Sequence, residues 1–405
     1  MNEANRKSGA DRTRLLVAAL EKAKIDLLVC HLPINVLLTS GYWPIIGASL
    51  SLLTQEGEVL LIVPEDEKDF ARESWADRVI TFNPASLNEL KTIPDAVREP
   101  LSQAVSDLNI GPGKIVGFEG EPVCVPSSYV ASYSCNVWLI DLLRELMPFS
   151  ALLSASDLLA ELRAVLTAYE ISRVQLACTI AAHAFELGRD DIQEGLSETE
   201  IAVLFRMLLT SMRAGLAGVQ RADGDMFCMS GPNSFQAFAS FQQTQNRQLC
   251  RGDLVLVHCN SFVDGYCTDI TRTFCVGPPD IRQTRMLEAI FEARAAALEA
   301  IKPGVKAAAV DGAARTILKH HGFGSEFKHG LGHGVGFAAI DHNARPRLHP
   351  ASDDILKTGM VFNIEPAIYI EGLGGMRHCD MVAVTETGAE VLTPFQAKAS
   401  SMIVS

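Results

Sequence analysis

Hydrophobic and polar positions alternate along the first 140 residues with two different periods. A 3.6-residue spacing predicts an amphipathic helix over 12–23 and a short helix over 34–38. Short apolar runs predict buried strands over 25–30, 50–53, 58–63, 114–118 and 138–140. Because helices and strands alternate, this part of the chain favours an α/β layer.

The composition changes near residue 155, where alanine- and leucine-rich segments begin. These segments predict helices over 155–166 and 168–188, and Ser197–Glu200 has the pattern of a capping box before a further helix. Strands and helices then mix. Strands are expected over 225–230, 254–261, 267–275, 360–365, 367–371 and 380–385, and helices over 282–301 and 307–321.

Composition and charge exclude several classes of protein. The chain has 405 residues, 48% of them hydrophobic and 20% charged, so we expect a folded protein of two domains. The net charge of −13 would repel a phosphate backbone, so a nucleic-acid partner is not expected. We find no apolar run long enough to span a membrane and no signal-like core near the start. Ten scattered cysteines without a CxxC pair indicate a reducing cytoplasm.

Three ionisable side chains stand in surroundings that are unusual for them. Asp269 lies in a predicted strand, where a carboxylate is costly unless it is paired or ligated; an ion pair with Arg272 or a capped turn is the alternative. His333 lies between two glycines, which let the backbone approach a ligand closely, and Glu365 lies in an apolar run before a proline. An imidazole and carboxylates from separate strands suit a hydrolytic metal site.

Four motifs in order resemble the pita-bread metallopeptidase family, which includes aminopeptidase P, prolidase, methionine aminopeptidase and the metal-free creatinase. The motifs are Gly265–Thr273, His329–Gly334, Glu365–Tyr369 and Arg377–Asp380. Residues 14–48 resemble the family's N-terminal domain. The resemblance implies an α+β fold, with a creatinase-type α/β domain over 1–157 and a pita-bread catalytic domain over 158–405.

The chain departs from the family at two of its five metal ligands. Members use Asp, Asp, His, Glu and Glu in chain order, and only Asp269, His333 and Glu365 match. His258 takes the place of the first aspartate, and Cys379 that of the last glutamate. Losing two carboxylates disfavours two adjacent dications, whose repulsion needs several negative charges to offset it.

The altered ligand set leaves three interpretations open. In the first, one divalent ion, with zinc the best fit, is bound by a mixed set of ligands: His258, Asp269, His333, Glu365 and Cys379. In the second, no metal binds, and His258 faces Cys379 as an imidazole–thiol pair that activates the thiol. In the third, Cys379 is an inert buried thiol in a decayed site.

The resemblance also implies residues near a substrate. Tyr369 and Arg377 match family positions there, and Phe238 stands where members often carry a histidine. His329 and His342 are expected to contact the substrate or a tetrahedral intermediate, although His342 requires a two-residue insertion after the metal histidine. Glu365 is the expected proton shuttle.

The sequence therefore predicts a cytoplasmic hydrolase of a C–N bond in a short peptide or small molecule. A metal-free amidinohydrolase or lyase that uses His258 and Cys379, and an inactive binding protein of the same fold, remain as alternatives. The family resemblance also implies a homodimer, to which the loop over 42–48 with Trp43 would contribute. No membrane partner is expected.

Overall fold

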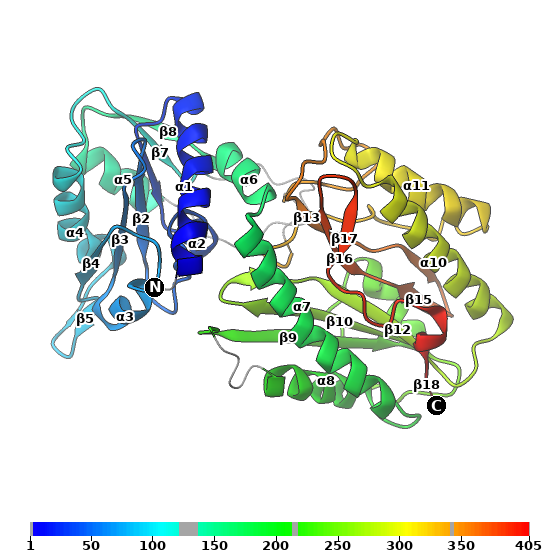
Figure 1. Ribbon diagram of the computed structural model, residues 1–405. Helices are drawn as coiled ribbons and strands as arrows, with labels where there is room; N and C mark the ends of the chain where they lie inside the picture. Colours follow the sequence, from blue (N-terminus) through cyan, green and yellow to red (C-terminus); the bar gives the residue numbers. More distant parts are fainter. Residues whose placement is uncertain (1–2, 121–136, 213–217, 341–343, 405) are drawn as a thin grey trace. The chain divides into compact units, whose positions relative to one another are not determined.

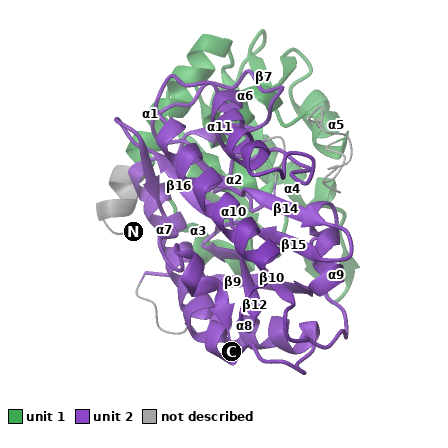
Figure 2. Cartoon of the chain, turned by 90° about the vertical axis from the view of Figure 1, so that its right-hand side faces the viewer, with its two compact units in different colours: residues 1–163 green, residues 164–405 purple. Residues whose placement is uncertain are grey.

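The computed structural model describes residues 3–120, 137–212, 218–340 and 344–404. They form two compact units, residues 1–163 and 164–405, which are coloured separately in Figure 2. This division falls near the end of helix α6 (Ser156–Ala164). The change of composition near residue 155 therefore coincides with the start of that helix.

A six-stranded sheet forms the centre of the first unit (Figure 1). Its strands, in the spatial order β4-β3-β2-β1-β7-β8, are Arg78–Phe82, Val59–Pro64, Leu50–Thr54, Leu27–Cys30, Ile115–Phe118 and Ala151–Ser154. Strand β1 pairs antiparallel with β2 and parallel with β7. Its four residues are all buried, as expected for a strand in the middle of a covered sheet. The predicted α/β layer is confirmed.

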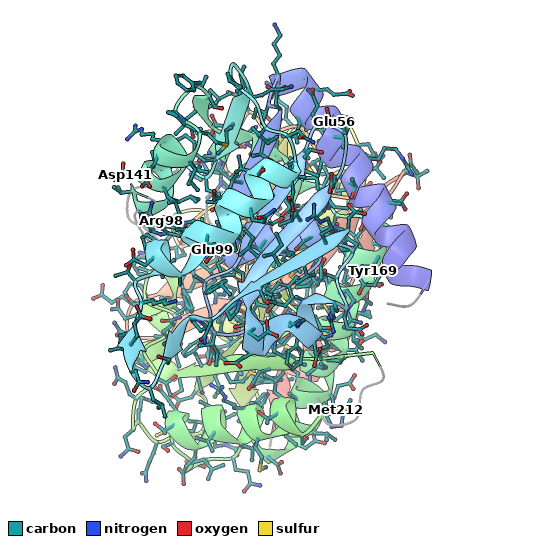
Figure 3. The ribbon with its side chains drawn as sticks, turned by 90° about the vertical axis from the view of Figure 1, so that its left-hand side faces the viewer. Glu56, Arg98, Glu99, Asp141, Tyr169 and Met212 are labelled. Atoms are coloured by element: carbon teal, nitrogen blue, oxygen red, sulfur yellow. The ribbon has the colours of Figure 1, made fainter. Side chains whose placement is uncertain are left out.

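Helices and shorter elements complete this unit. They are α1 (Glu3–Ala23), α2 (Pro33–Ser40), α3 (Lys68–Ala71), α4 (Ile93–Asp107), α5 (Val137–Leu146) and α6, with the 3₁₀ turn η1 (Glu65–Glu67) and a hairpin of β5 (Ala85–Ser86) and β6 (Glu89–Leu90). Figure 3 labels Arg98 and Glu99 on α4 and Asp141 on α5.

The strand predicted over 138–140 is wrong, because these residues lie in helix α5. The apolar residues Leu139, Leu142 and Leu143 recur with helical spacing and are buried in the core of the unit, together with Val97 and Leu101 of α4. A run of three apolar residues fits a helix turn as well as a strand, so the short window misled the interpretation.

The second unit combines a larger sheet with two small ones. Strands β11-β10-β12-β18 form one sheet in which β9 also pairs with β10, β13-β16-β17 form a second, and β14 pairs with β15. Their bounds are β9 Ala222–Ser230, β10 Leu254–Val263, β11 Tyr266–Cys267, β12 Ile270–Val276, β13 Val361–Ile364, β14 Ala367–Ile370, β15 Gly374–Arg377, β16 Asp380–Val384, β17 Ala389–Val391 and β18 Ile403–Val404. The expected α+β class is confirmed.

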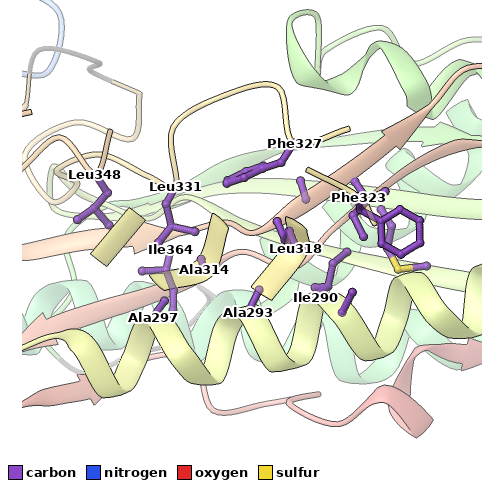
Figure 4. Close-up of a cluster of buried hydrophobic side chains, with 14 of the residues drawn as sticks. Ile290, Ala293, Ala297, Ala314, Leu318, Phe323, Phe327, Leu331, Leu348 and Ile364 are labelled. Carbon is purple, nitrogen blue, oxygen red and sulfur yellow. The ribbon is translucent and has the colours of Figure 1, made fainter. Parts of the chain in front are cut away.

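Four long helices pack on these strands. They are α7 (Ala168–Gly188), α8 (Glu198–Met212), α10 (Ile281–Ala300) and α11 (Ala307–His320); shorter turns are η2 (Arg189–Asp191), α9 (Gly231–Ser234), η3 (Phe235–Phe238) and η4 (Ala399–Met402). Helices α10 and α11 lie side by side (Figure 1), and small residues such as Ala293, Ala297 and Ala314 let them approach closely (Figure 4). Capping boxes begin α7 and α10, which fixes both helix starts.

Across the described ranges, no helix combines the length and the apolar character needed to cross a bilayer.

Candidate active site

The antiparallel strands β10 and β12 carry the first part of the site. Asp264 (φ 49°) and Gly265 (φ 88°) turn the chain back between them, and residue 258 lies directly opposite Thr271 in the register. Asp269 immediately precedes β12 and is only 4% exposed. This register makes His258 and Thr271 close neighbours on adjacent strands.

Glycines hold His333 in place before strand β13. A Cβ atom at Gly332 would lie 2.0 Å from the carbonyl oxygen of Asn363, so no larger residue fits there. The close approach lets the backbone N–H of His333 donate to Oδ1 of Asn363 at 2.7 Å. The ring Nδ1 lies 3.0 Å from the carbonyl oxygen of Gly334 and donates to it.

Asp269 and His333 form an ion pair. The Nε2 atom of His333 lies 3.5 Å from Oδ2 of Asp269. Burial lowers the pKa of His333, but Asp269 and Glu365 outweigh it and raise that pKa to about 9. Burial likewise raises the pKa of Asp269, but the two neighbouring histidines outweigh this effect and lower that pKa to about 2. At neutral pH the pair is therefore an aspartate and an imidazolium.

Arg377, the last residue of β15, crosses the middle of the site. Its Nε atom donates to Oγ1 of Thr271 at 3.1 Å, and its Nη2 atom donates to Nδ1 of His258 at 3.1 Å. The Nη1 atom lies 3.7 Å from Oε2 of Glu365. Its backbone N–H donates to Oγ1 of Thr273, which ties the strand to β12.

His258 is a neutral imidazole with both nitrogens in use. Because Nδ1 accepts from Arg377, the proton lies on Nε2, which donates to Oδ1 of Asn260 at 3.2 Å. Burial and, to a smaller extent, Arg377 lower the pKa of His258 to about 4 against the opposing effect of Asp269. The ring of Phe241 lies 4.7 Å from the imidazole, centroid to centroid.

Cys379 and His258 have other partners, so the proposed imidazole–thiol pair is not formed. Its thiol donates to the backbone oxygen of Asp269 at 3.1 Å, and within the described residues no hydrogen bond joins it to His258. Thr271 pairs with His258 on one side and forms a bridge with Cys379 on the other. The two residues are therefore two strand spacings apart, roughly 10 Å between backbones. Burial raises the pKa of the thiol well above its ordinary value.

Glu365 lies between β13 and β14 and is 8% exposed. Its backbone N–H donates to the carbonyl oxygen of Leu331 at 2.8 Å. Burial and, to a smaller extent, Asp269 raise the pKa of its carboxyl to about 7 against the opposing effect of Arg377. A carboxyl with such a pKa is present in both protonation states near neutral pH.

The residues expected near a substrate form an adjoining cluster. The hydroxyl of Tyr369 donates to Nε2 of His329 at 3.0 Å, because Nδ1 of that ring donates to the carbonyl oxygen of Gly330. The ring of Phe238 lies 5.9 Å from that of Tyr369. His342 lies outside the described residues.

The donor set does not fit a divalent metal. The five expected ligands, which are His258, Asp269, His333, Glu365 and Cys379, lie in one site, connected through Asp269 and Arg377. Yet in the part of the chain that is described, no group of three or more His, Cys, Asp or Glu residues is arranged to hold a metal ion. Asp269 is paired with His333, and a guanidinium lies between His258 and Glu365.

Three supporting residues were not recognised from the sequence as parts of the site. Asn363 positions His333, Asn260 accepts the Nε2 proton of His258, and Phe241 covers that ring. Asn363 carried a signal, since a buried amide inside the apolar run 361–364 needs a specific partner. The sequence around Phe241 gave no such signal, because its contact with His258 depends on how a loop folds over the sheet.

The Arg272 ion pair that the sequence offered for Asp269 is not formed. Arg272 is fully buried and donates from Nη2 to Oδ1 of Asp380 at 2.7 Å. Asp269 instead pairs with His333.

Models of known protein families match the sequence of each of the two units. Residues 172–386 match the model of metallopeptidase family M24, and residues 12–165 match that of the creatinase/prolidase N-terminal domain. The chain is 31% identical over 383 residues to a protein named Xaa-Pro dipeptidase from Pyrococcus furiosus, covering 95% of this chain and 97% of that one.

Solved structures of prolidases also match this chain over nearly its whole length. A prolidase from Pyrococcus horikoshii OT3 superposes with a TM-score of 0.76 at 28% identity, covering 95% of this chain and 99% of the other. A prolidase from Pyrococcus furiosus superposes with a TM-score of 0.73 at 30% identity, with coverage of 93% and 98%.

Proposed function

Because the chain belongs to metallopeptidase family M24 and is a hydrolase of that pita-bread family, we propose that it cleaves a C–N bond in a short peptide or a related small amide or amidine. The resemblance inferred from the four sequence motifs is thereby confirmed. Relatives named Xaa-Pro dipeptidase make such dipeptides the first substrates to test.

One observation carries the proposal: Glu365 is a buried carboxyl with a pKa of about 7 beside Arg377. A general acid–base group works best when its pKa lies near the working pH. In its ionised form Glu365 would accept a proton from the attacking water, and in its protonated form it would donate that proton to the leaving nitrogen. Both steps use the same oxygen atoms.

Tyr369 and His329 support a substrate-contacting role for the adjoining cluster. The hydrogen bond between them fixes the phenol, and the partly exposed Phe238 offers an apolar face beside it. A small substrate with one apolar group suits these neighbours. His342 remains part of this proposal on its sequence position alone.

Membership of a metallopeptidase family implies a divalent metal, but no metal step enters this proposal. The single zinc ion expected from the sequence needs ligands that are free to turn toward it. In the described residues those side chains are committed to one another or to the backbone.

We also propose, from the sequence and the family resemblance, that the enzyme is a cytoplasmic homodimer. The carboxylate of Glu67 accepts the backbone N–H groups of Ile45, Ile46 and Gly47, which holds the loop over 42–48 in one shape. The side chain of Ile46 is 94% exposed on that loop. Sedimentation of the native chain and of Ile46→Glu tests this assignment; a monomer for the native chain contradicts it.

The reaction is tested with a panel of Xaa-Pro dipeptides, other dipeptides, amides and amidines. Glu365→Gln keeps the shape of the side chain but cannot accept a proton, so we expect kcat to fall by about 100-fold or more with little change in KM. Glu386→Gln, an exposed glutamate of the same unit, is the matched control. Full activity of Glu365→Gln, or inertness of the native protein toward the whole panel, contradicts the proposal.

A further inference from the structure

We propose that the guanidinium of Arg377 supplies the positive charge at the centre of this site, and that the site holds no divalent metal of its own. This inference does not rest on the proposed reaction, because it concerns what the site binds. It follows from the disagreement between the family's metal chemistry and the contacts of these side chains.

The first step is that Arg377 is fixed rather than mobile. Each of its three nitrogens has a partner: Nε on Thr271, Nη2 on His258, and Nη1 near both Glu365 and the carbonyl oxygen of Ala237. The residue is only 5% exposed. A planar guanidinium that donates hydrogen bonds to acceptors on several segments is preorganised. It cannot swing away to admit an ion without breaking these contacts.

The second step is that the two substituted positions offer no lone pair to an ion. Nδ1 of His258 accepts from Arg377, and Nε2 faces Asn260. The thiol of Cys379 is directed at the backbone oxygen of Asp269, 3.1 Å away. A metal ligand must turn an unprotonated lone pair toward the ion; the lone pair of His258 is taken by Arg377, and the thiol of Cys379 keeps its proton.

The third step is the balance of charge. Asp269 and Glu365 are the carboxyl groups among the expected ligands, and Arg377 contacts one of them directly while His333 pairs with the other. Replacing an aspartate and a glutamate by His258 and Cys379 leaves too little negative charge for a dication beside a permanent cation. The negative charges of the two carboxylates are balanced by positively charged side chains of the same chain.

Metal content of the native protein is the direct test. The protein is purified without added metal, incubated with Zn²⁺ or Mn²⁺, dialysed, and measured by inductively coupled plasma mass spectrometry. We expect far less than one equivalent of either ion and no rise in Tm with added metal. One equivalent per chain that survives dialysis, and that is lost in His333→Asn, overturns the inference.

A gain of binding is the complementary test. The double variant His258→Asp with Cys379→Glu returns both carboxylates, and we expect it to bind Mn²⁺ stoichiometrically and to show a higher Tm when the ion is added. The control, His258→Asn with Cys379→Ser, adds no charge and should stay metal-free. If the control takes up as much Mn²⁺ as the carboxylate variant, the substituted positions do not decide metal binding and the inference fails.

The two proposals fail in different ways. Metal in the native protein overturns this inference but leaves C–N bond cleavage standing. Inertness toward the substrate panel overturns the proposed reaction, whereas metal content and Tm are unaffected by that result.

Discussion

The Nη2 atom of Arg377 lies 3.1 Å from Nδ1 of His258, so a histidine at a family metal-ligand position accepts a hydrogen bond from a cation of the same chain. This contact decides the tautomer of the imidazole. It also explains why His258, although imidazoles commonly bind zinc, does not serve as a ligand in this arrangement.

Removing Arg377 should make His258 easier to protonate. Burial and, to a smaller extent, the neighbouring guanidinium together lower the pKa of His258 to about 4, so Arg377→Met should raise that pKa. The imidazole resonances followed by ¹⁵N NMR against pH report the value directly. Arg377→Lys, which keeps the charge, should leave the pKa nearer that of the native protein. A pKa for His258 that is equal in all three proteins contradicts the assigned contact.

The ion pair of His333 should make the protein less stable in alkali. The pKa of this histidine is raised from 6.5 to about 9, so its contribution is fully present below pH 6.5 and is lost as the pH rises toward 9. The loss should be on the order of 3 kcal/mol of unfolding free energy. Urea denaturation between pH 6 and about 9.5 measures it.

His333→Asn provides the comparison for that measurement. Asparagine does not titrate, so the stability of the variant should fall less over the same window. An equal decline in the native protein and in the variant assigns the alkaline loss to other groups.

Gly332 should not tolerate a side chain, whereas Gly312 should. Alanine at Gly332 brings Cβ to 2.0 Å from the carbonyl oxygen of Asn363, so the His333 segment must shift, at a cost of about 1–3 kcal/mol. Gly312 lies inside α11 with nothing within 4 Å of its Cβ position, so alanine there should add about 0.5–1 kcal/mol of stability. Thermal denaturation distinguishes the two variants, and the interpretation fails if both have the same sign.

Much of the fold was predictable because local signals agreed with it. Helices α7 and α10 are long alanine- and leucine-rich segments that begin at capping residues, and the Asp264-Gly265 turn defines the β10–β12 pair. Helix α5 was missed since three apolar residues carry no usable period. The family motifs then located most of the site residues.

The contacts inside the site were not predictable, because they depend on tertiary register. Whether His258 meets Cys379 or Arg377 is decided by which strand lies between them, and Thr271 separates the first pair. Spacing along the chain contains no measure of that separation. The position of Arg377 over His258 likewise follows from the pairing of β15 with β14 and its hydrogen bonds to β12.

Cys379 should resist alkylation although it lies in the site. The thiol is fully buried, and burial raises its pKa, so almost no thiolate forms near neutral pH. Cys250 is exposed and should react with iodoacetamide before Cys379 does, as peptide mass spectrometry would show. Rapid labelling of Cys379 in the folded protein would restore the nucleophile interpretation that this geometry excludes.

The buried pair of Arg272 and Asp380 should be sensitive to the loss of either charge. Both side chains are fully buried, and Asp380 also accepts a hydrogen bond from Arg294. Asp380→Asn leaves two guanidinium groups without their carboxylate, so the free energy of unfolding should fall by about 3–5 kcal/mol in urea titrations. Arg98→Ala, which breaks the exposed pair with Glu145, should cause no measurable change.

The double variant Arg272→Met with Asp380→Leu removes both charges. Its free energy of unfolding should fall by less than the sum of the two single losses, since neither charge is then left uncompensated. Additive losses would show that the two residues stabilise the unit independently and not as a pair.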